Sequence, residues 1–362
     1  MRILVVNAGS SSLKLRVLDG DTVLGTEDLP AVGSLDPLDL RAALERLGAV
    51  DAVGHRIVHG GERFREPVIV DDDVRAALAS LTDLAPLHQP KSLAALDAVS
   101  GVAPWVPAVA CFDTAFHATL PPAAVTYAVP PEWRDRFRLR RYGFHGLSHA
   151  HAARRAAEMC AAAGGQSARV VTCHLGAGAS LAAVRDGRSI DTTMGFTPLD
   201  GLVMATRSGT VDPGAVLWLV THQHLDPEAV ADALEHRSGL AGLAGTSDMA
   251  AVVEGAETGE PGARLAFEVY IHRLRAGIAA MAASLGGLDA LAFTGGVGEN
   301  APAVRASAVE GLSFLGATLD AGGNASARPD ADVTAAGSRV RVLVVAARED
   351  LEIARSVRHL VG

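Results

Sequence analysis

A chain of 362 residues is longer than one ordinary hydrophobic core requires, so it predicts two domains that each bury most of their apolar surface. The formal net charge of -9 and the lack of a dense Lys/Arg run exclude nucleic acid and anionic membranes as expected partners. Cys111, Cys160 and Cys173 are scattered and show no metal-ligand spacing, which indicates reduced thiols in the cytoplasm rather than disulfides or structural zinc.

The apolar segments of the chain do not predict secretion or a membrane span. The apolar run at residues 3–6 is too short for the hydrophobic core of a signal peptide. The longer apolar stretch at residues 276–293 is interrupted by Gly286, Gly287 and Asp289. We therefore expect a cytoplasmic protein.

The chain begins with the pattern of a β-hairpin. Residues 3–6 predict a buried strand, residues 7–12 a tight turn, and residues 13–17 alternate apolar and polar side chains as a half-buried strand does. The same order returns at residues 170–184, where a strand, a glycine-rich turn and a second strand follow one another. This repetition indicates an internal duplication of one α/β unit.

Three further elements are predicted towards the end of the chain. A strand at residues 291–293 leads into a glycine turn at residues 295–298, and a helix is expected to start near Pro302. Residues 340–346 predict another strand. A helix from Glu349 is acidic in its first turn and basic in its last, as the helix dipole favours.

The first turn carries side chains suited to phosphate. Residues 7–14 read NAGSSSLK, which places three hydroxyl groups, closely spaced amides and one ammonium group after a strand. Lys14 and Lys91 are the only lysines, so a lysine in this turn is unusual for this chain. A serine-rich hairpin turn without a ligand is the alternative.

The segment at residues 55–61 predicts a second ligand-binding position. In an extended strand Arg56 and Val58 share one face. A guanidinium group binds carboxylate or phosphate in a fork, and a neighbouring valine can contact a methyl group. An arginine of an edge strand in a surface ion pair is the alternative.

Three further polar positions stand out. Asp113 follows an apolar run, His145 lies in the dense loop RRYGFHG at residues 140–146, and Arg207 follows a loop with Pro198. A structural histidine and a turn arginine are the alternatives, because 13 histidines and many arginines occur in the chain.

Seven separated blocks occur in one order along the chain. They are NAGSSSLKL, GHRIVHGGE, APLHQP, FDTAFH, RRYGFHG, CHLGAGAS with DTTMGFTPLDG, and TGGVGEN. This series resembles the acetokinase family, within the actin, sugar kinase and heat-shock ATPase superfamily, over essentially the whole chain.

The resemblance implies an α/β fold of two duplicated ribonuclease H-like (actin-like ATPase) domains with an interdomain active cleft. The first domain would comprise residues 1–113 plus the closing helix at 350–362, and residues 114–349 would form a nucleotide-binding and dimerisation domain. It also implies a homodimer.

The activity implied by the resemblance is acetate kinase, the reversible transfer of a phosphoryl group from ATP to acetate. The products are acetyl phosphate and ADP, and the transfer is direct and in line. The cofactors would be ATP or ADP and Mg²⁺, with Mn²⁺ as a second possibility. Hydrated magnesium suits sparse ligands, which here would be Asn7 and Glu349, directly or through water.

The resemblance also implies roles for residues of the cleft. The catalytic residues would be Asp113, Arg56, Arg207 and His145. The acyl group would be bound by Arg56, Val58, Leu87, Phe144 and Pro198. The nucleotide and its phosphates would contact Ser10, Ser12, Lys14, His174, Gly176, Gly178, Asp248, Gly296 and Gly298, and His88 would also touch the cleft.

The chemistry of the acceptor agrees with this set of residues. A carboxylate is ionised at neutral pH and needs no general base, so charge neutralisation and alignment are what the site must supply. Asp113 leaves open a sugar kinase, whose active site would be built around an isolated acidic residue. A propionate or other short-chain carboxylate kinase, a non-kinase ATPase module and a degenerate paralogue are further alternatives.

The chain departs from the family pattern at four positions. Ala177 and Ala250 stand where asparagine and arginine are usual, Thr210 replaces an aspartate and Arg348 replaces an asparagine. The contacts to the nucleotide are therefore the part of the site expected to differ from the family pattern.

Overall fold

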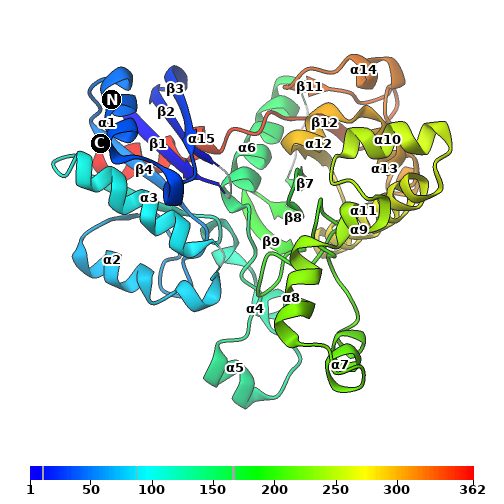
Figure 1. Cartoon of the computed structure of the whole chain (residues 1–362). Helices are drawn as coiled ribbons and strands as arrows, with labels where there is room; N and C mark the ends of the chain where they lie inside the picture. The colour runs from blue at the N-terminus through cyan, green and yellow to red at the C-terminus, as the bar shows by residue number, and fades with distance from the viewer. Residues whose placement is uncertain (10–11, 87, 165–167) are drawn as a thin grey trace. The chain divides into compact units, whose positions relative to one another are not determined.

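The computed structural model describes residues 1–9, 12–86, 88–164 and 168–362. The chain forms two compact units (Figure 1). The first comprises Met1–Ala118, Phe144–His151 and Arg348–Gly362, and the second comprises Thr119–Gly143 and Ala152–Ala347. These bounds differ from the expected domains at residues 114–118, 144–151 and 348–349, and the functions expected for the two domains stay predictions.

The first unit contains a six-stranded mixed sheet in the order β3-β2-β1-β4-β6-β5. β1, β4 and β6 are parallel neighbours, and the other pairings are antiparallel. The strands are β1 (Arg2–Ala8), β2 (Ser12–Asp19), β3 (Thr22–Pro30), β4 (Ala52–Ile57), β5 (Val68–Ile69) and β6 (Ala108–Phe112). The helices are α1 (Pro37–Leu47), α2 (Asp72–Ala79), α3 (Gln89–Val102) and α15 (Glu349–Val361), with 3-10 turns at Val32–Ser34, Thr82–Leu84 and Ala115–Thr119.

The second unit repeats this sheet. Its order is β11-β12-β10-β7-β8-β9, and β7, β10 and β12 are parallel while β8, β9 and β11 join antiparallel. β7 thus corresponds to β1, β8 to β2 and β10 to β4, which confirms the predicted duplication. The strands are β7 (Arg169–Leu175), β8 (Ala179–Arg185), β9 (Arg188–Thr192), β10 (Ala290–Thr294), β11 (Ala331–Asp332) and β12 (Arg341–Val344).

The remaining helices belong to the second unit, except that α6 begins in the first unit's segment Phe144–His151. They are α4 (Pro122–Val125), α5 (Pro131–Phe137), α6 (Gly146–Ala162), α7 (Pro213–Thr221), α8 (Pro227–His236), α9 (Gly239–Ala244), α10 (Met249–Thr258), α11 (Pro261–Leu285), α12 (Gly295–Asn300), α13 (Pro302–Glu310) and α14 (Ala321–Ser326), with a 3-10 turn at Ser313–Leu315. The helix expected from Pro302 is confirmed as α13. The glycine turn expected at residues 295–298 is wrong, because these residues form α12.

The first sheet is covered on both faces. Ile3 and Val5 of β1 pack with Ile353 and Val357 of α15, as expected for a closing helix. Alternate residues of the same strand pack towards α1 and α3 on the other face. Gly54 of β4 allows the close approach of α15, because a Cβ atom there would lie 2.4 Å from Cγ2 of Ile353.

Among the described residues, no helix is long and apolar enough to cross a membrane.

Candidate active site

Arg56 and Asp113 form the centre of a polar network in the first unit. Arg56 lies near the end of β4 and Asp113 directly follows β6, so both stand at the carboxyl edge of neighbouring parallel strands. The Arg56 Nη2 atom donates a hydrogen bond of 2.6 Å to Oδ2 of Asp113, and Nε donates to both carboxylate oxygens at 3.1 Å. The guanidinium group is thereby held in one orientation.

Asn7 and Glu349 complete this network. Asn7 comes from β1, the other parallel neighbour of β4, and Glu349 begins α15. The Asn7 Oδ1 atom accepts a hydrogen bond of 3.2 Å from Nη1 of Arg56, and its Nδ2 donates one of 3.3 Å to Oε2 of Glu349. Oε2 of Glu349 also lies 3.7 Å from Nη1 of Arg56. Four elements far apart in sequence thus bring both predicted metal-side residues to the predicted catalytic pair.

The charges of this network are only partly shielded from water. The Asp113 side chain is 2% exposed, whereas those of Arg56 and Glu349 are 20% and 16% exposed. Burial by itself would lower the pKa of Arg56, but Asp113 and Glu349 raise it above its usual value. Burial raises the pKa of the Asp113 carboxyl group, and the Arg56 guanidinium opposes that rise. The arginine therefore stays charged and accessible from one side.

Gly9, Ser12 and Lys14 are among the described residues around the serine-rich turn. Lys14 of β2 is paired with Asn7 in the antiparallel ladder, and its exposed side chain forms no ion pair or hydrogen bond with the described residues. The carbonyl oxygen of Ser12 accepts a hydrogen bond of 2.8 Å from the amide of Gly9. Ser10, another predicted phosphate contact, lies outside the described residues.

The segment with Phe144 and His145 is fixed to Asp113. The Gly146 amide donates a hydrogen bond of 2.8 Å to the carbonyl oxygen of Asp113. A Cβ atom on Gly146 would lie 2.2 Å from that oxygen, so only glycine allows this approach. His145, the preceding residue, has a φ of 56°, in the left-handed region that non-glycine residues rarely adopt. Phe144 is buried, with its ring centroid 5.5 Å from that of His59.

The structure gives the positions of Val58 and His88, two further residues expected in the cleft. Val58 directly follows β4 and is half-buried, and His88 precedes α3. Leu87 lies outside the described residues. Val58 therefore belongs to the same strand end as Arg56, as the alternation of the sequence predicts.

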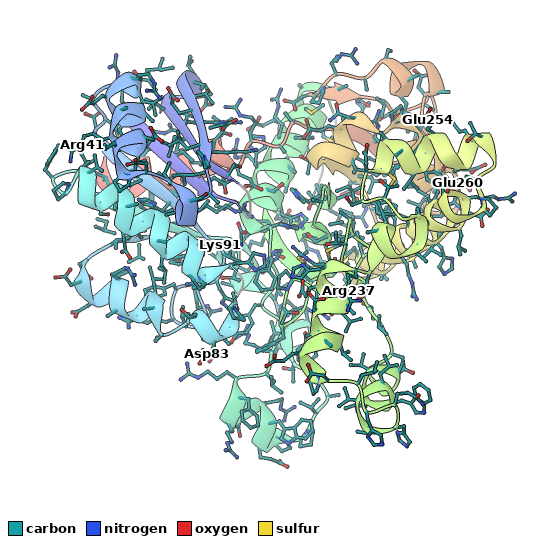
Figure 2. All side chains as sticks on the ribbon, viewed as in Figure 1. Arg41, Asp83, Lys91, Arg237, Glu254 and Glu260 are labelled. Carbon is teal, nitrogen blue, oxygen red and sulfur yellow. The ribbon has the colours of Figure 1, made fainter. Side chains whose placement is uncertain are left out.

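A pocket of about 590 Å³ in the second unit gathers the predicted nucleotide contacts Gly176, Asp248 and Gly296. Ala177 and Ala250, two of the departures from the family pattern, line the same pocket. Two acidic residues of α10 line it as well, Glu257 and Glu254, the latter labelled in Figure 2. Such a volume is ordinary for a small-molecule site.

Backbone amides donate hydrogen bonds that close the turns around this pocket. The Gly176 amide donates to the carbonyl oxygen of Gly178 at 2.9 Å, directly after β7, which ends one residue past His174. Gly298 is buried in α12 and does not line the pocket. Asp248 is the N-cap of α10 and accepts a hydrogen bond of 3.0 Å from the amide of Ala250.

Arg207 and Pro198 lie together in the second unit. The Arg207 Nη1 atom donates a hydrogen bond of 3.0 Å to the carbonyl oxygen of Pro198, and Nε lies 3.3 Å from Oε2 of Glu235. Burial lowers the pKa of Arg207, and Glu235 acts in the opposite direction. Glu235 lies on α8 and was missed by the sequence analysis, because no local pattern links it to Arg207.

Two of the departures have local partners. Arg348, which precedes Glu349, donates from Nε to Oδ1 of Asp350 at 2.9 Å. The Thr210 hydroxyl group donates to Oδ1 of Asp200 at 2.6 Å.

The description "Acetokinase family" belongs to a family model that matches residues 31–355. The chain belongs to the acetokinase family. An acetate kinase of Trichormus variabilis is 48% identical over 321 residues, which are 88% of this chain and 78% of that protein. This membership confirms the resemblance on which the predicted residue roles depend.

Solved structures of the acetokinase family agree in fold. A propionate kinase from Francisella tularensis subsp. tularensis SCHU S4 has a TM-score of 0.91 at 34% identity and covers 99% of this chain and 100% of that one. An acetate kinase from Porphyromonas gingivalis has a TM-score of 0.90 at 32% identity, and both chains are fully covered. The predicted α/β fold with duplicated actin-like domains is thereby confirmed.

Proposed function

We propose that this chain is an acetate kinase that transfers the γ-phosphoryl group of ATP reversibly to acetate. A carboxylate oxygen of acetate forms a bond to the γ-phosphorus atom, and the bond from that atom to the β,γ-bridging oxygen breaks, which releases ADP. Family membership supports the reaction, and the observation that carries it is the network of Arg56, Asp113, Asn7 and Glu349. This network supplies positive charge and oxygen ligands, and its two carboxylates are assigned to Arg56 and to the proposed metal. Such a site suits an acceptor that is already ionised and needs no general base.

Arg56 is the proposed contact to the transferring phosphoryl group. A guanidinium group has five N–H donors. Those used for Asp113 and Asn7 leave one N–H on each of Nη1 and Nη2 without a hydrogen-bond partner among the described residues, although Oε2 of Glu349 lies 3.7 Å from Nη1. Asp113 orients this group, and we assign His145 and Arg207 to the phosphoryl oxygens on the resemblance alone.

Mg²⁺ is the proposed metal, and the donor atoms of Asn7 and Glu349 suit it. Mg²⁺ prefers oxygen ligands and usually takes only one or two from the protein, with phosphates and water completing the shell. Oε1 of Glu349 accepts no hydrogen bond from the described part of the chain. When bound, the metal would neutralise phosphate charge, and Mn²⁺ is a second candidate.

ATP or ADP is the proposed occupant of the pocket at Gly176, Asp248 and Gly296. The support is its volume, the glycines Gly176 and Gly296 in its wall and the agreement with residues chosen from the family pattern. Ser12 and Lys14 of the first unit, and Ser10, are proposed phosphate contacts, as are His174 and Gly178. Three residues assigned to the nucleotide, His174, Gly178 and Gly298, do not line this pocket, and their roles are proposed on the resemblance alone.

Acetate is the proposed acceptor, with Val58, Leu87, Phe144 and Pro198 around its methyl group. Propionate is the second candidate, because a propionate kinase is among the structures most similar to this chain. One methylene group changes the discrimination by only about 1 to 3 kcal/mol, so the fold does not rank the two acids.

Trapping of the acyl phosphate with hydroxylamine tests the proposal. The purified chain is incubated with ATP and Mg²⁺ and with acetate, propionate or butyrate, and the hydroxamate is measured beside ADP. We expect acetyl hydroxamate in proportion to ADP. ADP without hydroxamate would favour a non-kinase ATPase module, and neither product would favour a degenerate paralogue.

A homodimer in the cytoplasm is also proposed, on the resemblance. Light scattering coupled to size-exclusion chromatography measures the mass of the particle, and a mass of one chain would contradict the dimer.

A further inference from the structure

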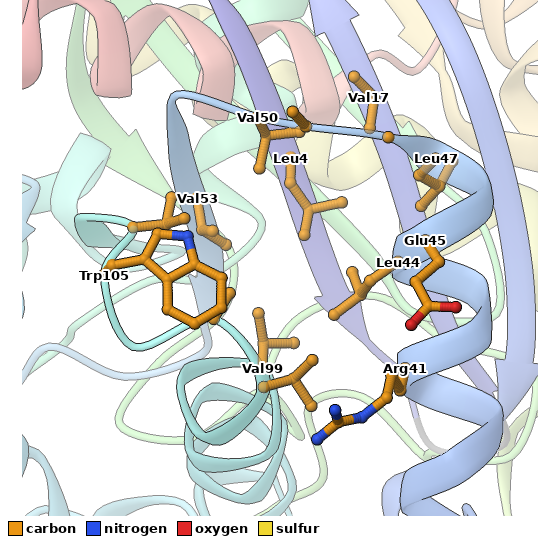
Figure 3. Close-up of a pocket in the computed structure, with 15 residues that line it drawn as sticks. Leu4, Val17, Arg41, Leu44, Glu45, Leu47, Val50, Val53, Val99 and Trp105 are labelled. Atoms are coloured by element: carbon orange, nitrogen blue, oxygen red, sulfur yellow. The ribbon is translucent and has the colours of Figure 1, made fainter.

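A second pocket, of about 340 Å³, lies in the first unit between the sheet and the helices α1 and α3 (Figure 3). No residue assigned to the candidate active site lines it. Its floor faces α1 and α3, whereas Gly54, two residues before Arg56 on β4, faces α15. The pocket is therefore separate from the network of Arg56 and Asp113.

The floor and walls of this pocket are apolar. Leu4, Val17 and Val53 come from β1, β2 and β4 and close the bottom of the pocket, where they are at most 2% exposed. The apolar surface open to a ligand belongs to half-buried wall residues, among them Leu44, Leu47 and Val102. Leu44 of α1 and Val99 of α3 stand on opposite sides of the cavity (Figure 3). A ligand that enters would place an apolar group against these walls, which removes apolar surface from water and favours binding.

An exposed aromatic ring stands at the rim. Trp105 follows α3, lines the pocket and is 79% exposed, a high value for the largest apolar side chain. Its ring can cover an apolar ligand without any change in the core.

The rim also carries one charge of each sign. Arg41 and Glu45 lie one turn apart on α1, and both line the pocket. Figure 3 shows the guanidinium group of Arg41 extending from α1 towards Val99, and the carboxylate of Glu45 lying over the helix in this view. Both side chains are exposed, and neither forms an ion pair or a side-chain hydrogen bond with the residues that the structure describes.

We propose that this pocket binds a free α-amino acid with an apolar side chain, of the size of leucine or phenylalanine. The side chain enters the apolar cavity below Trp105, the α-carboxylate lies at Arg41 and the α-ammonium group lies at Glu45. A volume of about 340 Å³ is within the range of small-molecule sites.

The pair of rim charges selects a zwitterion over singly charged amphiphiles. A fatty acid would bring its carboxylate close to Glu45, and a hydrophobic amine would bring its cation close to Arg41. Only a ligand with both charges meets an opposite charge at each residue. Because the rim is solvated, each of these contacts adds modest selectivity.

Fluorescence of Trp105 measures the binding directly. The chain has three tryptophans, and Trp133→Phe with Trp218→Phe leaves Trp105 as the single one, with both changes in the second unit. This full-length protein is titrated with leucine, phenylalanine, 3-phenylpropanoate, 2-phenylethylamine and glycine, without nucleotide or acetate. The result is thus independent of the proposed kinase activity.

We expect leucine and phenylalanine to shift the Trp105 emission to shorter wavelength with saturation in the millimolar range, and glycine to have no effect. The two single-charge analogues should bind about twofold to fivefold more weakly than phenylalanine, the scale of one exposed ion pair.

Charge variants at the rim test the assigned contacts. In Arg41→Ala, phenylalanine should lose its advantage over 2-phenylethylamine, and in Glu45→Ala its advantage over 3-phenylpropanoate. Lys91→Ala and Asp83→Ala remove the same charges from exposed positions of this unit outside the pocket (Figure 2), and should change neither ratio. The proposal is overturned if no probe gives a saturable shift, if a single-charge analogue binds as tightly as phenylalanine, or if the ratios are the same in rim and control variants.

Discussion

Arg56 and Asp113 are 57 residues apart in sequence, yet a hydrogen bond of 2.6 Å joins them across the neighbouring strands β4 and β6. The Asp113 side chain is almost fully buried, and the Arg56 side chain is one-fifth exposed. Arg56 therefore neutralises the charge of the buried Asp113 carboxylate. Its remaining N–H groups can still donate hydrogen bonds to a ligand. In the proposed mechanism the same ion pair serves stability and catalysis, and variants can separate the two.

Arg56→Ala should lower turnover by at least about two orders of magnitude, because it removes the proposed charge on the transferring phosphoryl group. It should also destabilise the fold by about 3 kcal/mol, because Asp113 is left buried and unpaired. Arg56→Ala with Asp113→Asn should recover much of the stability and none of the turnover. Urea unfolding and hydroxamate formation measure the two quantities, and a double variant that regains activity would remove Arg56 from catalysis.

Arg207→Ala should also lower turnover by at least about two orders of magnitude, if Arg207 contacts the phosphoryl group as proposed. Its pairing with Glu235 in the second unit is an alternative, purely structural role. Arg237→Ala is the matched control, since Arg237 forms an exposed ion pair with Asp232 in the same region (Figure 2). Near-parental ADP release by Arg207→Ala would leave only the structural role.

The duplicated hairpins were predictable because their apolar periodicity is local. Residues 13–17 alternate as β2 requires, with Leu13 and Leu15 fully buried and Lys14 exposed. The prediction of a glycine turn at residues 295–298 was wrong, and the reason is also local. Glycine usually weakens helices, but the φ of 79° at Gly295 turns the chain beside Leu175, where a Cβ atom would lie 2.7 Å from a carbonyl oxygen. Close packing between β7 and α12 therefore determines that these residues form a helix.

The residues of the candidate site were chosen from motifs, and physical reasoning explains only part of their arrangement. The common strand edge explains why Asn7, Arg56 and Asp113 meet. Glu235 was not predictable, because it comes from a different helix and its pairing depends on packing. The same holds for the approach of Gly146 to Asp113, which fixes the position of His145.

His55→Leu should make the fold less sensitive to acid. Both ring nitrogens of His55 are buried without a partner in the described structure, and burial lowers the pKa to about 4 from 6.5. Below pH 6.5 His55 binds a proton in the unfolded chain but stays neutral in the folded chain, so the free energy of unfolding falls as the pH drops towards 4. At pH 5 this loss is about 2 kcal/mol for one histidine, and leucine abolishes it.

Urea unfolding at pH 8 and pH 5 measures this difference. His272→Leu is the control, because His272 is exposed on α11. Burial also lowers the pKa of His59 to about 4. His59 is present in all variants, so its contribution cancels when their losses of stability are compared. An equal loss of stability in His55→Leu and the parent would show that His55 is not the acid-sensitive group.

Val58→Ala should enlarge the proposed acyl pocket and shift the ratio of kcat/KM values towards propionate by about tenfold or less, the scale of one methylene group. The KM for ATP should stay constant, because the pocket assigned to the nucleotide belongs to the second unit. Rates with both acids and with varied ATP decide this point. An unchanged acid preference with a changed KM for ATP would place Val58 outside the acyl pocket.

Ala177 and Ala250 line one pocket, although 73 residues separate them, and both side chains are exposed. They stand where the family pattern offers an amide and a guanidinium group. Loss of a hydrogen bond to a charged group costs about 1.5 to 3 kcal/mol, so we expect weak nucleotide binding with ordinary turnover at saturating ATP.

Ala177→Asn with Ala250→Arg should then tighten ATP and ADP by about tenfold or more and leave the KM for acetate unchanged. Glu254 lies one helical turn beyond Ala250 on α10 and could pair with the new arginine, so the same double variant with Glu254→Gln is needed. Calorimetric titration of both nucleotides compares the parent, the double and the triple variant. A gain in the triple variant alone would mean that Glu254 captures the new arginine, whereas no gain in either would mean that the two alanines are no functional loss.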